Sequence, residues 1–212
     1  MLTWGDVCVV VKTVAGARPS ELAALQGQLA AQGVLPALTA AGEPGEAPRD
    51  NFRRVLRLGA ASGREWLLHL EDDAYLAPDF AAKALALIGR GTANLWTFYS
   101  ARKEDGEALA AGKECRRVTP GAFANTQAVA FPCCLIPHLL AYLPEWEAKH
   151  PEHRSAVDYF LGAFCRRERL LIQASVPSLV QHRAGKSLLG HRARFGRVSR
   201  TFAAAYGEVP PC

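Results

Sequence analysis

The hydrophobic and polar positions along the chain alternate between two periods, which predicts strands and helices in turn. Residues 6–14 (DVCVVVKTV) form a β-branched apolar run that is typical of a buried, parallel strand. Apolar residues then recur at helical spacing from Pro19 until Gly33. Further strands are expected at 34–38, 66–70, 95–99, 127–131 and 170–176, further helices at 50–63, 78–88, 137–143 and 156–166, and loops at 41–48 and 102–114. This alternation predicts a single small α/β domain with a mostly parallel sheet flanked by helices.

Length and composition agree with one folded domain of this kind. The chain has 212 residues, of which 50% are hydrophobic and 21% charged, so extensive disorder is excluded. We find no signal peptide at the start of the chain and no apolar run of 18 residues that could span a membrane. The six cysteines lack the spacing of a zinc site, and without a secretion signal they indicate reduced thiols. We therefore expect a cytoplasmic protein.

Positive charge gathers near the end of the chain. The net charge is +5, and no acidic residue lies between Glu168 and Glu208. Seven cations fall in that stretch: Arg169, Arg183, Lys186, Arg192, Arg194, Arg197 and Arg200. Such a stretch attracts phosphates, nucleic acid or acidic lipid, although a solvated basic face is the simpler alternative.

Three consecutive acidic residues, Glu71, Asp72 and Asp73, follow the predicted strand 66–70. Ligands bind at the carboxyl ends of strands in an open α/β sheet, and clustered carboxylates repel one another unless a cation neutralises them. Hard cations such as Mg²⁺ and Mn²⁺ bind both carboxylate and phosphate oxygens. The triplet therefore indicates a metal that bridges the protein and a diphosphate. The alternative is an acidic helix start, with the carboxylates near the dipole of the helix after Pro78.

The segment WLLHLEDDAYLAPDF resembles the acidic, DxD-type segment of GT-A glycosyltransferases. The resemblance implies a GT-A-like, Rossmann-like fold and an Mn²⁺ or Mg²⁺ ion that helps to bind a nucleotide-sugar donor, most simply a UDP-sugar. Glu71 and Asp72 would approach the nucleotide, and Asp73 would be the metal ligand.

A second stretch, SVPSLVQHRAGKSLLG at 175–190, resembles the C-terminal segment of several GT-A families. There a histidine completes the metal site or contacts the diphosphate, which implies a metal-ligand role for His182. Lys186 would bind phosphate. As an alternative, His182 is simply a polar residue that follows a strand.

Four further residues are weaker candidates. Asp158, at the start of an apolar helix, resembles the catalytic base of inverting GT-A enzymes, although a first-turn carboxylate also stabilises its own helix. Thr13 ends the first strand, where such enzymes bind the base and ribose. Asn51 and Arg54 begin the helix before the acidic strand and would contact the donor, while Arg54 is equally well explained as a surface charge.

The acceptor is open between two classes. Small GT-A-like enzymes of phages glycosylate hydroxymethylated DNA bases, and the basic stretch suits a DNA acceptor in a phage-infected cytoplasm. The competing acceptor is a surface-polysaccharide or lipid-linked sugar made on the cytoplasmic side, with the basic stretch facing the membrane. Another metal-dependent nucleotide enzyme, or a nucleotide- or nucleic-acid-binding protein without activity, remains an alternative. We expect a catalytic domain at 1–190 and a basic tail at 191–212.

Overall fold

The computed structural model describes residues 1–34, 37–124, 126–153, 156–183 and 198–207. Within them, seven strands form one sheet in the order β2-β1-β3-β7-β5-β8-β6, and β4 and β9 form a separate two-stranded ribbon. The strands are β1 (Val7–Val14), β2 (Ala37–Gly42), β3 (Trp66–Glu71), β4 (Ala74–Leu76), β5 (Leu95–Thr97), β6 (Cys115–Val118), β7 (Ala128–Pro132), β8 (Ile172–Ser175) and β9 (Val180–His182).

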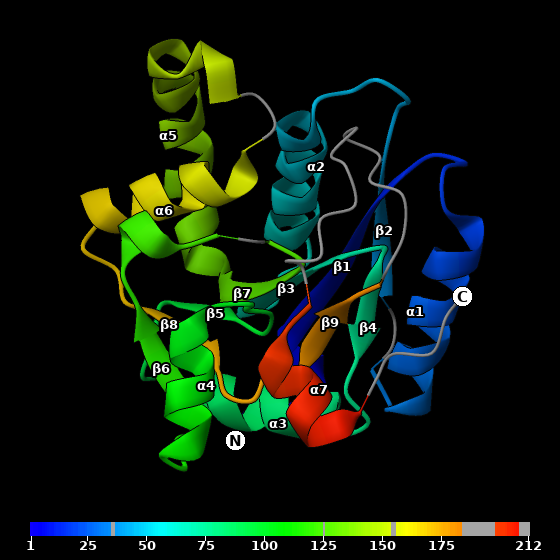
Figure 1. Cartoon of the computed structure of the whole chain (residues 1–212). Coiled ribbons are helices and arrows are strands. Elements are labelled where there is room, and N and C mark those ends of the chain that lie inside the picture. Colours follow the sequence, from blue (N-terminus) through cyan, green and yellow to red (C-terminus); the bar gives the residue numbers. More distant parts are fainter. Residues whose placement is uncertain (35–36, 125, 154–155, 184–197, 208–212) are drawn as a thin grey trace.

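The α-helices pack on both faces of the large sheet (Figure 1). They are α1 (Pro19–Ala31), α2 (Pro48–Ala61), α3 (Phe80–Gly89), α4 (Lys103–Ala110), α5 (Ile136–Lys149), α6 (Val157–Arg167) and α7 (Arg200–Tyr206), with short 3-10 helices η1 (Trp4–Asp6), η2 (Pro120–Ala122), η3 (Cys133–Leu135) and η4 (Pro151–His153). No helix among the described residues has the length and apolar character needed to cross a membrane.

Strand direction confirms the predicted fold class. Strand β1 pairs in parallel with both β2 and β3, and β5 pairs in parallel with β8. Strand β7 lies between β3 and β5 and is antiparallel to both, so β1, β2, β3, β5 and β8 all run in the same direction. Within this sheet, only β7 and β6 run in the opposite direction. The sheet is thus largely parallel and flanked by helices in one small α/β domain, which is consistent with a GT-A-like, Rossmann-like fold.

The period-2 pattern of β1 builds the two halves of the core. Val7, Val9 and Val11 face the layer that contains α1, α3 and α7, whereas Cys8 and Val10 face the layer that contains α2, α5 and α6. Strand β1 is buried on both faces, as its continuous apolar run predicts. The five described cysteines, Cys8, Cys115, Cys133, Cys134 and Cys165, are free thiols.

Several local predictions are wrong. The expected loop at 102–114 contains α4, which begins where the Arg102 N–H donates to the Asp105 carboxylate at 2.9 Å. Asp105 is buried because it pairs with Arg116 of β6, so a polar segment is anchored by charge and not by an apolar face. The predicted strand at 34–38 lies later, as β2, and α2 begins at Pro48, two residues before the predicted start at residue 50.

The end of the described chain is part of the domain. Helix α7 places Phe202 in the core with the α3 side chains, and its Ser199 cap accepts from the Phe202 N–H. The predicted boundary at residue 190 lies outside the described residues and stays a prediction. Residues 198–207 of the predicted tail nevertheless pack against the body of the protein.

Candidate functional site

The acidic triplet lies where β1 and β3 end side by side. Lys12 of β1 is in register with Glu71, the last residue of β3. The Asp72 N–H then donates to the Lys12 carbonyl at 3.1 Å, which carries the chain over the end of β1. Consecutive side chains of an extended segment point in opposite directions, so Glu71 and Asp72 face different neighbours.

Glu71 is bound by one cation and one hydroxyl group. Its Oε1 accepts from Lys12 Nζ at 2.9 Å and from Thr126 Oγ1 at 3.1 Å. Burial disfavours the charged carboxylate, but the Lys12 ammonium keeps the pKa of Glu71 below its ordinary value. Glu71 is therefore ionised, and the charge of Lys12 already balances its own. One of its two carboxylate oxygens, Oε1, is occupied by protein partners and would have to exchange them for a ligand.

Asp72 connects the triplet to the end of β1. Its Oδ2 accepts from Thr13 Oγ1 at 2.6 Å, and the Thr13 carbonyl accepts from Asn51 Nδ2 at 2.6 Å. Burial raises the pKa of Asp72 more than the Thr13 hydrogen bond lowers it, and the neighbouring Asp73 charge acts in the same direction as burial. Thr13, Asn51 and Asp72, predicted separately, thus form one hydrogen-bonded chain.

Asp73 meets two basic side chains. Arg18 Nη1 bonds to Asp73 Oδ2 and lies 3.3 Å from Asp72 Oδ1, so one guanidinium faces both carboxylates. His182 Nε2 lies 3.2 Å from the same Asp73 Oδ2. Strand β9 holds His182 there, because Ala74 is in register with His182 and the Arg183 N–H donates to the Asp73 carbonyl at 2.9 Å.

The two nitrogens of His182 have different surroundings. Nδ1 lies 2.7 Å from the Arg183 carbonyl oxygen, which only accepts, so Nδ1 carries a proton. Nε2 then faces the Asp73 carboxylate either as the donor of an imidazolium or as a lone pair with a cation between the two groups. An N–H bound to a backbone carbonyl is also the arrangement that orients metal-binding histidines.

Buried acceptor oxygens without a hydrogen-bond partner gather around this network. Among the described residues, Asp73 Oδ1, Asn51 Oδ1 and Gln127 Oε1 are buried and unpaired. Asn51 and Gln127 both border the triplet, since the Gln127 carbonyl accepts from the Glu71 N–H at 2.9 Å. Unpaired buried acceptors are costly, and a cation or the N–H and O–H groups of a ligand would satisfy them.

The remaining sequence candidates lie apart or outside the description. Arg54 pairs with Glu46 beside the end of β2, and its side chain is 41% exposed. Asp158 is partly exposed in the first turn of α6, where its Oδ1 accepts from the Tyr159 N–H at 3.0 Å, and it is not among the side chains of the network above. Lys186 lies outside the described residues.

Sequence reasoning missed Lys12, Arg18, Thr126 and Gln127. A signal existed for Lys12, because it interrupts an otherwise apolar strand close to its carboxyl end. Arg18 gave none, since an arginine before a helix-opening proline is ordinary in a surface loop.

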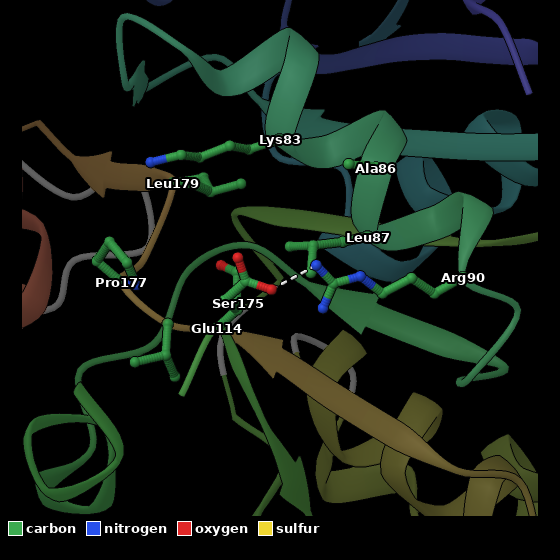
Figure 2. Close-up of a pocket in the computed structure, with 9 residues that line it drawn as sticks. Lys83, Ala86, Leu87, Arg90, Glu114, Ser175, Pro177 and Leu179 are labelled. Atoms are coloured by element: carbon green, nitrogen blue, oxygen red, sulfur yellow. Dashed lines mark hydrogen bonds and ion pairs between the residues drawn. The ribbon is translucent and has the colours of Figure 1, made fainter. Parts of the chain in front are cut away.

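A pocket beside α3 contains none of the predicted site residues (Figure 2). Its charged groups are paired, Arg90 with Glu114 and Lys83 with Asp79 at 2.7 Å. The acidic network is therefore the better candidate for a functional site.

Comparison with known proteins adds a likeness in fold. No protein-family model and no curated protein matches the chain. The crystal structure of A197 from STIV is similar over 87% of this chain and 92% of its own, with 10% identity and a TM-score of 0.51. A glycosyltransferase involved in the glycosylation of the major capsid of PBCV-1 is a more distant neighbour, with 16% identity, coverage of 64% and 66%, and a TM-score of 0.35.

Proposed function

We propose that this protein is a metal-dependent glycosyltransferase that transfers a sugar from a nucleotide-sugar, a UDP-sugar in the simplest case, to an acceptor hydroxyl. The observation that carries the proposal is the group of unpaired buried acceptors beside Asp72 and Asp73 at the ends of β1 and β3. This is the edge of an α/β sheet at which ligands bind. The order and chemistry of the GT-A-like segments in the sequence support the same function.

The residues present fit a divalent metal ion. Asp72 and Asp73 carry two negative charges against the single charge of Arg18, and Asp73 Oδ1 is an unpaired carboxylate oxygen. Asp73 would hold the ion, with His182 as the nitrogen ligand. A bound Mn²⁺ or Mg²⁺ supplies charge stabilisation for the departing nucleoside diphosphate.

The protein's own groups would do the rest. Thr13 and Asn51 form the wall beside Asp72, where Asn51 Oδ1 can accept from the base or ribose of a donor. Arg18 would donate to a phosphate oxygen in exchange for part of its contact with Asp72. Asp158 would take the proton of the acceptor hydroxyl if the reaction inverts the anomeric carbon, a role that its partly exposed position leaves open to an acceptor.

Donor binding tests the proposal directly. With Mn²⁺ present, Asp73→Asn should lower the affinity for a UDP-sugar at least about tenfold in titration calorimetry, because the carboxylate that binds the ion is lost. Asp50→Asn is the matched control, since the Asp50 side chain is 44% exposed and pairs with nearby Arg53 on α2, so its loss should leave binding unchanged. Equal affinity of Asp73→Asn and the unaltered protein would contradict the site.

A second measurement addresses the acceptor. The protein is incubated with UDP- and GDP-sugars, with and without DNA that contains hydroxymethylcytosine, and released nucleoside diphosphate is counted. Metal-dependent release that rises with the modified DNA would support a DNA acceptor. Slow release that ignores DNA would favour a carbohydrate or lipid-linked acceptor, and no release with any donor would contradict a glycosyltransferase.

A further inference from the structure

We infer that His150, Glu152 and His153 form a second site, separate from the acidic triplet, which binds a divalent transition-metal ion of the zinc type. His150 follows the last residue of α5, and Glu152 and His153 belong to the short helix η4 that comes next. One ligand atom from each residue lies within 4.8 Å of the other two. This inference does not depend on the proposed function.

The distances are close to those of a metal site. Glu152 Oε1 lies 3.3 Å from His153 Nε2 and 3.7 Å from His150 Nδ1. Ligands about 2.1 Å from a tetrahedral ion are about 3.4 Å from one another, so the carboxylate is already placed between two imidazole nitrogens as required. Only the two imidazole nitrogens need to approach each other, from at most 4.8 Å to about 3.4 Å.

Aromatic contacts hold the imidazole rings in place. Trp146, which is buried, lies against both histidines, with ring centroids 5.1 Å from His150 and 6.3 Å from His153. Tyr159 also stacks on His153, with ring centroids 5.2 Å apart. The backbone is also fixed, because the His153 N–H donates to the His150 carbonyl at 3.1 Å. Ligands that are ordered before binding lose little conformational entropy when the ion arrives.

The ligand set selects the class of metal. Two imidazoles and one carboxylate suit zinc and its neighbours, whereas Mg²⁺ and Ca²⁺ prefer oxygen ligands alone. Because the side chains of His150, Glu152 and His153 are 44%, 60% and 42% exposed, water can complete the coordination. The two candidate metal sites thus differ in chemistry: two carboxylates and one imidazole near Asp73, and two imidazoles and one carboxylate here.

The first turn of α2 contacts both candidate metal sites. Arg49, in the first turn of α2, lies over the Trp146 ring at 5.3 Å, and its Nη1 lies 3.5 Å from the His153 carbonyl oxygen. Asn51, two residues later in the same turn, bonds to Thr13 beside Asp72. A metal ion at η4 would therefore bind beside the end of α2 that borders the acidic network.

Calorimetric titration with Zn²⁺ tests the site. The experiment uses the full chain carrying Asp73→Asn, which weakens binding at the acidic network. One saturable Zn²⁺ site is expected, and adding His150→Ala and His153→Ala should weaken it at least about tenfold. Because Trp146 touches both rings, Co²⁺ should also quench part of the tryptophan fluorescence, and the same double substitution should abolish that quenching.

His138→Ala is the matched control, because His138 is an exposed histidine on α5, the helix that precedes the cluster. Its loss should leave Zn²⁺ binding unchanged. Circular dichroism of the His150→Ala, His153→Ala chain establishes that it is folded. Absence of saturable binding to the Asp73→Asn chain, or binding that the double substitution does not weaken, would overturn the inference whether or not the protein proves to be a glycosyltransferase.

Discussion

At the scale of single residues, Arg18 determines the electrostatics of the acidic network. Its guanidinium faces two carboxylates whose side chains are only 7% and 10% exposed. Two buried like charges without a cation would repel each other strongly, because the local dielectric constant is low. The arginine therefore stabilises the site without a metal and competes with a metal for the same oxygens.

Arg18→Gln should destabilise the protein by about 3 kcal/mol, because it leaves buried carboxylates without their cation. Mn²⁺ should then raise the melting temperature of Arg18→Gln by more than it raises that of the unaltered protein, since the ion replaces the missing charge. Thermal unfolding with and without Mn²⁺ measures both effects. Arg54→Gln is the control, with a cost below about 1 kcal/mol, because Arg54 is half-exposed. Equal Mn²⁺ shifts in all three proteins would refute the competition.

His69 gives a pH dependence that can be separated from the acidic network. The residue is fully buried in β3 against the Phe52 ring, and both of its ring nitrogens lack a hydrogen-bond partner. Burial, with a smaller effect of the Lys12 charge, lowers the pKa of His69 from 6.5 to about 3. Between those two pH values His69 is protonated in the unfolded chain and neutral in the folded chain. The free energy of unfolding therefore falls as the pH falls from 6.5 towards 3.

His69→Leu should remove that slope. Between pH 7.5 and 5.0 the unaltered protein should lose about 2 kcal/mol more stability than His69→Leu, as urea unfolding at the two pH values would measure. The window lies above the range in which ordinary carboxyl groups titrate. His138→Leu, at an exposed position, should keep the slope of the unaltered protein. The same slope in His69→Leu would show that another group titrates.

The sequence was informative about residues of the site that belong to a recognisable segment. The acidic run after an apolar strand is a local signal, and the resemblance to GT-A segments implied that His182 lies beside it, as the structure has it. Arg18 and Lys12 could not be assigned in the same way, since their partners are 54 and 59 positions away. The roles of Asp73, His182 and Asp158 in chemistry stay predictions.

At the scale of elements, strands with a full apolar run were predicted well and those held by long-range pairing were not. Strands β1 and β3 consist mostly of buried apolar side chains, so they can be recognised from the sequence alone. The ribbon strands β4 and β9 have only three residues each, and they exist because Ala74–Leu76 meet Val180–His182. No local pattern of hydrophobicity specifies such a pair.

Helix α7 should contribute measurably to the stability of the whole domain. Phe202 is 1% exposed and its ring lies 6.1 Å from that of Tyr75, in the ribbon beside the acidic network. Phe202→Ala should therefore cost about 3 kcal/mol or more in urea unfolding, through lost burial and the cavity that remains. Val198→Ala is the control at a site that is 54% exposed, with an expected change within about 0.5 kcal/mol. A small effect of Phe202→Ala would mean that residues after 190 are a dispensable tail.

At the scale of the whole molecule, the acidic and basic groups to which we assign different functions lie in different parts of the chain. The acidic network is buried at the strand ends, whereas cations predominate in the sequence after Glu168. Arg192, Arg194 and Arg197 lie outside the described residues, so the DNA-facing role proposed for them comes from the sequence.

Replacing those three arginines together by glutamine should reduce the salt dependence of any DNA binding. Each phosphate contact contributes about one unit to the slope of log affinity against log salt concentration, so the slope should fall by about 3. Fluorescence anisotropy of labelled duplex DNA at several salt concentrations measures the slope. The same triple substitution should leave UDP-sugar affinity unchanged, which serves as the internal control. An unaltered slope would exclude this stretch from DNA contact.

The pairing of β4 with β9 also has a consequence for biosynthesis. Asp73 and His182 are 109 positions apart, yet the ribbon between them forms one wall of the site. The ribosome synthesises the chain from its N-terminus, so Thr13, Arg18 and the acidic triplet emerge long before strand β9. The site therefore closes only after translation has passed His182, and a nascent chain stopped before that point exposes Ala74 and Leu76 to solvent or to a chaperone.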